Sequence, residues 1–196
     1  MTGGLARTEI DRETGAGDES RLALRARQDP DAFAALYHRY LDPIYRYCYR
    51  RLETPEAAED AASQVFERAL KSIHQYRGGS FRAWLFRIAY TTVVDSYKWR
   101  SPTVGDVDQD LPDPDPTPEA RSIQRESAEN VQQLLRHLTE EQARVVELRL
   151  AGLKGPEIAE VMGRKTDAVR MLQYRAMERL RRHLDNDQST EARDDT

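Results

Sequence analysis

The chain has a single cysteine, Cys48, which excludes a disulfide framework and a thiolate zinc site within one chain. It also lacks a phosphate-cradling glycine loop and any Ser/His/Asp set at a catalytic spacing. No stretch approaches the roughly 20 apolar residues of a membrane-spanning helix, and residues 1–20 contain no signal-peptide core. The four histidines are scattered: His38, His74, His137 and His183. We therefore expect a soluble cytoplasmic protein that is not an enzyme and needs no metal or cofactor.

Negative charge is concentrated in three segments, although the whole chain of 196 residues has a formal net charge of only −4. Residues 1–20 carry −3, residues 101–120 carry −6 and residues 185–196 carry −4. The remainder of the chain therefore carries +9. Because that remainder also has the apolar pattern of folded helices, its positive charge indicates an anionic partner such as nucleic acid.

Apolar residues recur at intervals of three and four outside these segments, which predicts helices and not strands. The expected fold is all-α, with two small helical domains joined by an acidic linker rich in Pro and Asp. Because that linker can bury little apolar surface, we expect two independently folded, flexibly joined blocks. The expected divisions are a disordered lead-in at 1–20, a first helical domain at 21–100, a linker at 101–120, a second helical domain at 121–184 and an acidic tail at 185–196.

The first domain contains three predicted helices. Pro43 should bend or break the first, and Cys48 should be buried in its aromatic run. Thr54 is the expected N-cap of the second and Ser80 that of the third. The predicted core face of the second helix is Ala58, Ala62, Val65, Phe66, Ala69, Leu70 and Ile73, and that of the third is Phe81, Trp84, Leu85, Ile88, Ala89, Thr92 and Val93.

The second domain is predicted to end in a helix-turn-helix. Thr139 and Gln142 form a capping box, Gly152 ends that helix, and two further helices follow. In the last helix, Val169, Leu172, Ala176, Leu180 and Leu184 share one face that should pack against Val145, Val146, Leu148, Ile158, Ala159 and Met162. His183 is expected to be a solvated residue near the helix end.

A different face of this last helix is suited to DNA. Asp167, Arg170, Met171 and Tyr174 lie together at the end that would enter a major groove, where short side chains reach base edges. Lys165, Arg175, Arg179, Arg181 and Arg182 can lie beside phosphates, which supply affinity without reading sequence. A basic amphipathic helix could also simply face solvent without binding DNA. The short helix before it, which is joined to it by a turn that contains glycine, favours a helix-turn-helix.

The stretch LTEEQARVVELRLAGLKGPEIAEVMGRKTDAVRMLQYRAMERLRRHL resembles the upstream-element-reading domain of bacterial RNA polymerase sigma factors of the extracytoplasmic-function (ECF) group. DPDAFAALYHRYLDPIYRYCYRRL, AEDAASQVFERAL and YRGGSFRAWLFRIAY are similar to successive helices of the other conserved domain of that group. The resemblance implies a transcription initiation factor that binds core RNA polymerase and promoter DNA, controlled by an anti-sigma factor. It assigns upstream (minus-thirty-five) element recognition to Lys165, Thr166, Asp167, Arg170, Met171, Tyr174 and Arg175.

The same resemblance implies roles for the first domain. The second helix would dock on polymerase through Glu56, Asp60, Gln64 and Glu67, although a solvated stripe would have the same composition. The third would grip and help melt the minus-ten element, with aromatic and basic residues for single-stranded bases. The residues implied there are Arg87, Tyr90, Thr91, Asp95, Lys98 and Trp99. Tyr90-Thr91 replaces the Arg-Asn common in the group, so the base preference at this element is open.

Two other classes share parts of the pattern. Response regulators carry a similar helix-turn-helix, but they place an alternating βαβ receiver before it, whereas residues 21–100 have helical periodicity. A helical adaptor without a nucleic-acid role would not need a charge of +9 on its folded parts. Both alternatives are less consistent with the sequence than a sigma factor.

Overall fold

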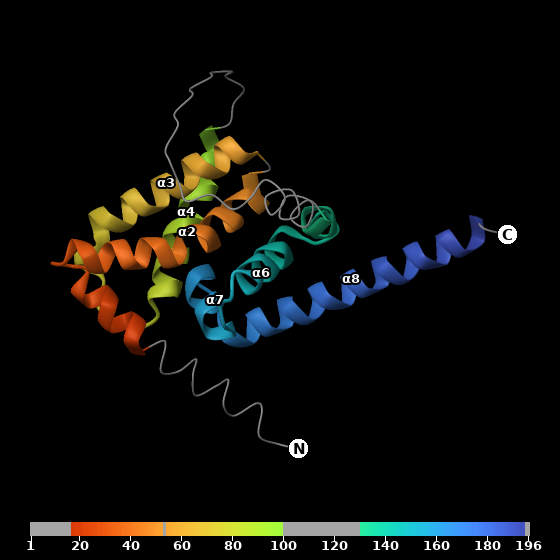
Figure 1. Ribbon diagram of the computed structural model, residues 1–196. Helices are drawn as coiled ribbons and strands as arrows, with labels where there is room; N and C mark the ends of the chain where they lie inside the picture. The colour runs from red at the N-terminus through yellow and green to blue at the C-terminus, as the bar shows by residue number, and fades with distance from the viewer. Residues whose placement is uncertain (1–16, 53, 100–129, 195–196) are drawn as a thin grey trace, which may run out of the picture.

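The computed structural model describes residues 17–52, 54–99 and 130–194. Every regular element in these ranges is a helix, which confirms the all-α prediction. The N-terminal half contains a helix at 17–25, α2 (Pro30–Leu52), α3 (Pro55–Ser72), the short 3-10 helix η1 (Ile73–Gln75) and α4 (Phe81–Trp99) (Figure 1). The C-terminal half contains helical residues 130–136, α6 (Glu140–Leu150), α7 (Gly155–Met162) and α8 (Thr166–Asp194). The predicted linker at 101–120 lies outside the described residues.

The N-terminal half is a bundle in which α3 packs along both α2 and α4. The buried stripe of α2 has helical spacing and includes Leu36, Tyr40, Ile44 and Tyr47, each no more than 1% exposed. Helix α2 continues through Pro43, so of the expected bend or break, the break does not occur. A proline inside a helix costs about 3 kcal/mol or more, and burial of large side chains on both sides of it, at about 1.5–3 kcal/mol each, offsets that cost.

Local capping sequences determine where α3, α4 and α6 begin. The Thr54 hydroxyl accepts a hydrogen bond from the backbone N–H of Ala57 at 3.4 Å, and the Ser80 hydroxyl accepts one from Ala83 at 3.1 Å. Thr139 and Gln142 form the capping box of α6. All three predicted starts are confirmed.

The predicted core faces are largely confirmed. Of the α3 face, Ala58, Ala62, Val65, Phe66, Ala69 and Ile73 are buried, and of the α4 face, Phe81, Leu85, Ala89, Thr92 and Val93 are buried, with Trp84 and Ile88 half-buried. The C-terminal core includes Val145, Leu148, Ile158, Ala159, Val169 and Ala176. Leu70 and Leu184 are 55% and 46% exposed, contrary to prediction.

Two segments predicted to lack structure are partly helical. The first helix begins at residue 17, four residues inside the expected lead-in. Its residues are tied to the bundle, because the Tyr40 hydroxyl donates to the carboxylate of Glu19 and Ser20 hydrogen-bonds the Tyr76 hydroxyl at 3.1 Å. Helix α8 continues to Asp194 through most of the expected acidic tail, and projects beyond the rest of the molecule (Figure 1).

The two halves pack against each other in this structure, which differs from the expected flexible separation of the two blocks. Helix α4 packs on α7 and α2 contacts α6, and the buried apolar residues of both halves form one cluster. The Arg82 guanidinium donates to the carbonyl of Gly152 at 3.0 Å. The halves approach closely there, because a Cβ at position 152 would lie 2.9 Å from that guanidinium. The composition of a linker does not determine whether the domains it joins make contact.

A buried carboxylate, Glu147 of α6, lies in this interface. Its side chain is 3% exposed, and its Oε2 is 3.5 Å from the guanidinium of Arg51 on α2. Tyr47 and Arg50 of α2 and Arg144 of α6 also face it. Burial raises the pKa of Glu147 to about 7, although the three arginines act in the opposite direction.

Cys48 is shielded from solvent, whereas the ring pair of His137 and His183 lies at the surface. Cys48 is fully buried, as predicted, and burial raises the pKa of its thiol to about 12. His183 is half-buried and not solvated as expected, because its ring stacks on that of His137 with centroids 3.5 Å apart.

The described residues contain no cluster of three or more His, Cys, Asp or Glu able to hold a metal ion. Within the same ranges, no helix combines the length and apolarity needed to cross a membrane.

The burial of Glu147 predicts a pH dependence of stability. Its pKa is about 7 in the folded chain and 4.5 for an ordinary glutamate, so the folded chain binds more protons between these values. The free energy of unfolding therefore falls as pH rises from about 4.5 to about 7. Glu147→Gln cannot titrate, so its thermal midpoint, measured by circular dichroism, should fall less than that of wild type across this window. Parallel profiles for the two proteins would contradict the assignment.

Candidate nucleic-acid interface

The first turns of α8 expose one face to solvent. Asp167, Arg170, Met171 and Tyr174 are all exposed, the last two at 48% and 63%. Val169 and Ala176, on another side of the helix, are buried where α8 packs on α6 and α7. Sequence spacing thus correctly placed these four residues together, outside the core. Neighbouring exposed Met and Tyr side chains beside charges are suited to contact with base edges.

The turn between α7 and α8 sets the angle at which this face is presented. Gly163 ends α7 with φ of 62°, a left-handed conformation that favours glycine. The next residue, Arg164, donates its backbone N–H to Ala159 at 2.9 Å, and its side chain pairs with Glu141 of α6. The small Ala159, 6% exposed, sits in the packed part of α7. These contacts fix α8 against the two preceding helices, with Lys165 and Thr166 exposed at its start.

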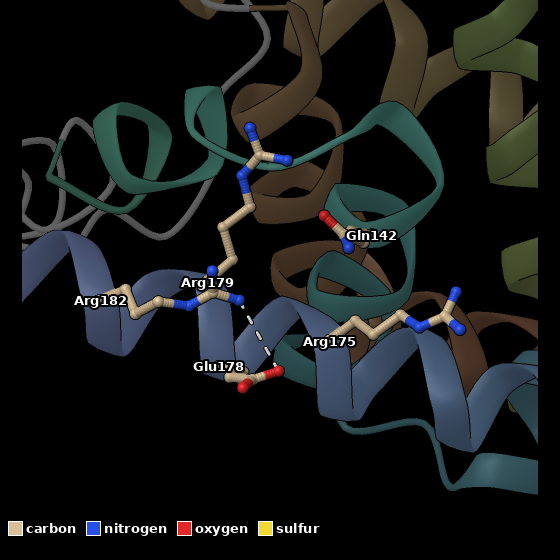
Figure 2. Close-up of a pocket in the computed structure, with 5 residues that line it drawn as sticks. All are labelled: Gln142, Arg175, Glu178, Arg179 and Arg182. Carbon is tan, nitrogen blue, oxygen red and sulfur yellow. Dashed lines mark ion pairs between the residues drawn. The ribbon is translucent and has the colours of Figure 1, made fainter.

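Arginines flank the exposed face of α8. Figure 2 shows the open surface hollow that is lined by Gln142, Arg175, Glu178, Arg179 and Arg182. Arg182 pairs with Glu178 at 3.7 Å, whereas Arg179 extends toward the residues that precede α6 (Figure 2). Arg181 is exposed on the same helix. Three of the five residues that line the hollow are arginines, a composition that suits contact with phosphate oxygens.

Two of the predicted minus-ten residues on α4 are engaged by the other half of the protein. Arg87 donates to the backbone carbonyl of Glu160 at 2.9 Å, and its guanidinium is 4.0 Å from the Glu160 carboxylate. The Tyr90 hydroxyl accepts a hydrogen bond from Arg144 at 2.8 Å, with the Arg144 guanidinium 5.2 Å from the ring centroid. Both side chains therefore contact the C-terminal half in this structure.

The other predicted α4 residues differ in their surroundings. Thr91 is exposed, and its hydroxyl donates to carbonyls of its own helix. Asp95 pairs with Arg68 of α3 at 3.1 Å, and Arg68 also donates to the buried Thr92 hydroxyl. Lys98 and Trp99 lie in the last turn of α4, with side chains outside the described set. Sequence reasoning missed Arg68 and Arg144, because nothing in a helical pattern identifies the partner of a charged residue on another helix.

The polar stripe of α3 is fully on the surface. Glu56, Asp60, Gln64 and Glu67 are all exposed, while Val65 and Phe66 on the other side are buried. Lys71 pairs with Glu67, and this hydrogen bond lowers the pKa of the Glu67 carboxyl. The structure therefore presents the four predicted polymerase-facing residues together on the exposed side of α3.

Family models match both halves of the chain. Sigma-70 region 2 matches residues 36–102, and Sigma-70, region 4 matches residues 128–180. The first covers α2 from Leu36 onward, α3 and α4. The second covers α6, α7 and the exposed face of α8, with Arg175 and Arg179 but not Arg181 or Arg182.

Individual sigma factors and a solved structure are also similar to this chain. The chain is 37% identical over 166 residues to the ECF RNA polymerase sigma factor BldN of Streptomyces coelicolor, covering 81% of this chain but only 62% of that protein. It is 32% identical over 148 residues to the ECF RNA polymerase sigma factor SigD of Mycobacterium tuberculosis, covering 70% of each. CnrH, solved in complex with the cytosolic domain of CnrY, shares the fold, with a TM-score of 0.68 and 24% identity over 86% of this chain and 98% of that one.

The fold similarity extends to the sigma factor RpoE from Bartonella quintana, solved with the anti-sigma factor NepR. Its TM-score is 0.59 at 16% identity, covering 78% of this chain and 96% of that one. The matches to region 2 and region 4 occur in the order that the two halves have here, and the helix-turn-helix is where region 4 places it. The chain belongs to the sigma-70 family of RNA polymerase sigma factors, in its extracytoplasmic-function group.

Proposed function

We propose that this chain binds core RNA polymerase in the cytoplasm and directs it to specific promoters without catalysing a reaction itself. The observation that carries the proposal is the exposed face of α8, which presents Arg170, Met171 and Tyr174 within a rigid helix-turn-helix. The two domains at 21–100 and 121–184 divide the work. The first contacts polymerase and the minus-ten element, and the second contacts the upstream element.

The proposed upstream contacts separate into reading and positioning residues. Asp167, Arg170, Met171 and Tyr174 read base edges from the major groove, because they share the exposed face near the start of α8. The positioning residues Lys165, Thr166 and Arg175 hold the phosphates on either side. Arg179, Arg181 and Arg182 extend this phosphate contact along the helix.

The proposed contacts of the first domain lie on two helices. Exposed Glu56, Asp60, Gln64 and Glu67 of α3 form the polymerase-binding stripe, and their acidity suits a basic partner surface. On α4, the minus-ten residues are Arg87, Tyr90, Thr91, Asp95, Lys98 and Trp99. Stacking on aromatic rings beside basic groups is the way proteins hold unpaired bases, which supports a role in melting.

We expect purified core polymerase to gain promoter-specific initiation when this chain is added. Transcripts from a genomic DNA library, sequenced at their 5′ ends, should then share one upstream and one minus-ten motif. The charge-reversed variant Asp60→Lys should lose this activity, because it places a cation in the acidic stripe, and the same change at exposed Glu59 off the predicted stripe is the matched control. Unchanged transcription on adding the chain would rule the proposal out.

Arg170 and Arg182 are exposed arginines of one helix with different proposed tasks. Arg170→Ala should cost about 1–3 kcal/mol on the cognate upstream element and little on other sequences, if the guanidinium contacts a base edge. Arg182→Ala should weaken binding of the polymerase complex to all sequences and reduce its salt dependence. Binding to a panel of promoter variants at several salt concentrations distinguishes them. Identical behaviour of the two variants would show that the reading face is misassigned.

An anti-sigma factor is the proposed partner that controls this protein. RpoE of Bartonella quintana, which shares its fold, was solved with such a factor. The exposed surface of α3, proposed to bind polymerase, and that of α8, proposed to bind DNA, are the ones such a partner must cover. Affinity purification from cells in which the target promoter is silent should recover one additional small protein besides polymerase. Recovery of polymerase alone would contradict this part of the proposal.

A further inference from the structure

One residue of α3, Arg68, reaches the face of α4 that carries proposed minus-ten residues. Its Nη1 donates to the Thr92 hydroxyl at 3.2 Å and to Asp95 Oδ2 at 3.1 Å, so one nitrogen bridges two residues a turn apart on α4. Helices α3 and α4 pack side by side, which brings the guanidinium there (Figure 1). Helical spacing places Arg87, Thr91 and Asp95 on one face of α4. Arg68 therefore borders the proposed DNA face, although it belongs to the helix proposed to bind polymerase.

The surroundings of Arg68 fix its guanidinium at the edge of this face. Thr92 is fully buried, and its hydroxyl donates to the Ile88 carbonyl, which leaves the hydroxyl oxygen to accept from Arg68. The Arg68–Asp95 pair itself is at the surface, with side chains 44% and 48% exposed, and such pairs add little to the free energy of folding. A buried hydroxyl thus positions the guanidinium, and the guanidinium positions an exposed carboxylate.

The carboxylate of Asp95 has one oxygen held and one available to a ligand. Oδ2 is bound by Arg68, whereas Oδ1 has no partner among the residues that the structure describes. An unpaired carboxylate on a helix that faces DNA would repel phosphates, and the charge of Arg68 compensates it. An ionised carboxylate can only accept hydrogen bonds, so the group that Oδ1 contacts must be a donor.

Only some base edges offer a donor to a single acceptor oxygen. Cytosine N4 and adenine N6 are amino groups, whereas guanine and thymine present the carbonyl oxygens O6 and O4 there, which a carboxylate would repel. Thr91, one turn before Asp95, offers different chemistry, because its hydroxyl donates to the Arg87 and Ile88 carbonyls of its own helix. Of these two exposed α4 residues, Asp95 is the one suited to distinguish amino from carbonyl bases.

We propose that Arg68 is a positioning residue, which holds Asp95 so that its Oδ1 selects cytosine or adenine, through the exocyclic amino group, at one position of the minus-ten element. This inference rests on the proposed function and names the base chemistry that the first domain recognises. Arg68 acts through Asp95 in two ways. It compensates the carboxylate charge beside the phosphates, and it keeps Oδ2 bound to α3 while Oδ1 faces the base.

Base preference on forked DNA tests the role of Asp95. The full chain with core polymerase is bound to a promoter identified by transcription, with one strand of the minus-ten region unpaired and each of its bases varied; each strand is tested. Wild type should prefer cytosine or adenine about five- to tenfold at one position, the lower range for a base contact. Asp95→Asn should reverse this preference. Because Arg68 only donates, it holds the amide oxygen and turns the NH2 toward guanine O6 or thymine O4.

A double variant tests positioning by Arg68. When Arg68→Ala is added to Asp95→Asn, the amide can present either its oxygen or its NH2, so the preference should fall to about twofold or less. A merely structural role of Arg68 would lower binding to all bases equally and leave the reversed ratio unchanged. Arg46→Ala, which breaks an exposed arginine–aspartate pair with Asp42 on α2, is the matched control and should keep the wild-type preference. Circular dichroism confirms that each variant is folded.

The outcomes separate this inference from the proposed function. Failure of wild type to initiate at any promoter would refute the proposed function. A wild type that initiates but has no amino-base preference, or an Asp95→Asn protein that retains it, would overturn only the role of Asp95. A double variant with the same reversed preference as Asp95→Asn would overturn positioning by Arg68. Loss of core-polymerase affinity in Arg68→Ala would do the same, because it would place Arg68 in the polymerase contact.

Discussion

Contact between α4 and α7 is the constraint on which the arrangement of the protein depends. Helix α4 packs on α3 in its own half and on α7 in the other, so apolar residues of both halves bury one another. The same contact brings Glu147 to the arginines of α2 and Arg144 to Tyr90. Helix α4, which is proposed to bind melted DNA, therefore also forms the interface between the two halves.

Local features were predictable from sequence because their interactions are local. The caps at Thr54, Ser80 and Thr139 use hydrogen bonds to backbone three residues away. Continuation of α2 through Pro43 was not predictable in this way, because burial by neighbouring helices overrides the local cost. Helical residues 17–20 were missed for a similar reason, since Glu19 and Ser20 are held by tyrosines distant in sequence.

In the candidate site too, the sequence predicted local features but not contacts between distant residues. Helical spacing alone places Asp167, Arg170 and Tyr174 on one exposed face, and the structure agrees. The partners of α4 could not be inferred from spacing, because Arg144 is 54 residues from Tyr90 and reaches it only when the halves pack. Charge layout suggested an anionic partner, which stays a prediction, and it suggested independence of the two domains where the structure has a shared interface.

Crosslinking in the assembled transcription complex tests most directly whether α4 and α8 bind two separate promoter elements. A photoreactive phenylalanine analogue would replace Tyr90 or Tyr174 in the full chain, bound to core polymerase and a promoter identified by transcription. The account predicts that position 174 crosslinks to the upstream element and position 90 to DNA about 25 base pairs downstream, about 85 Å away along B-form DNA. Crosslinks from both positions to the same few base pairs, or none from position 90, would contradict it.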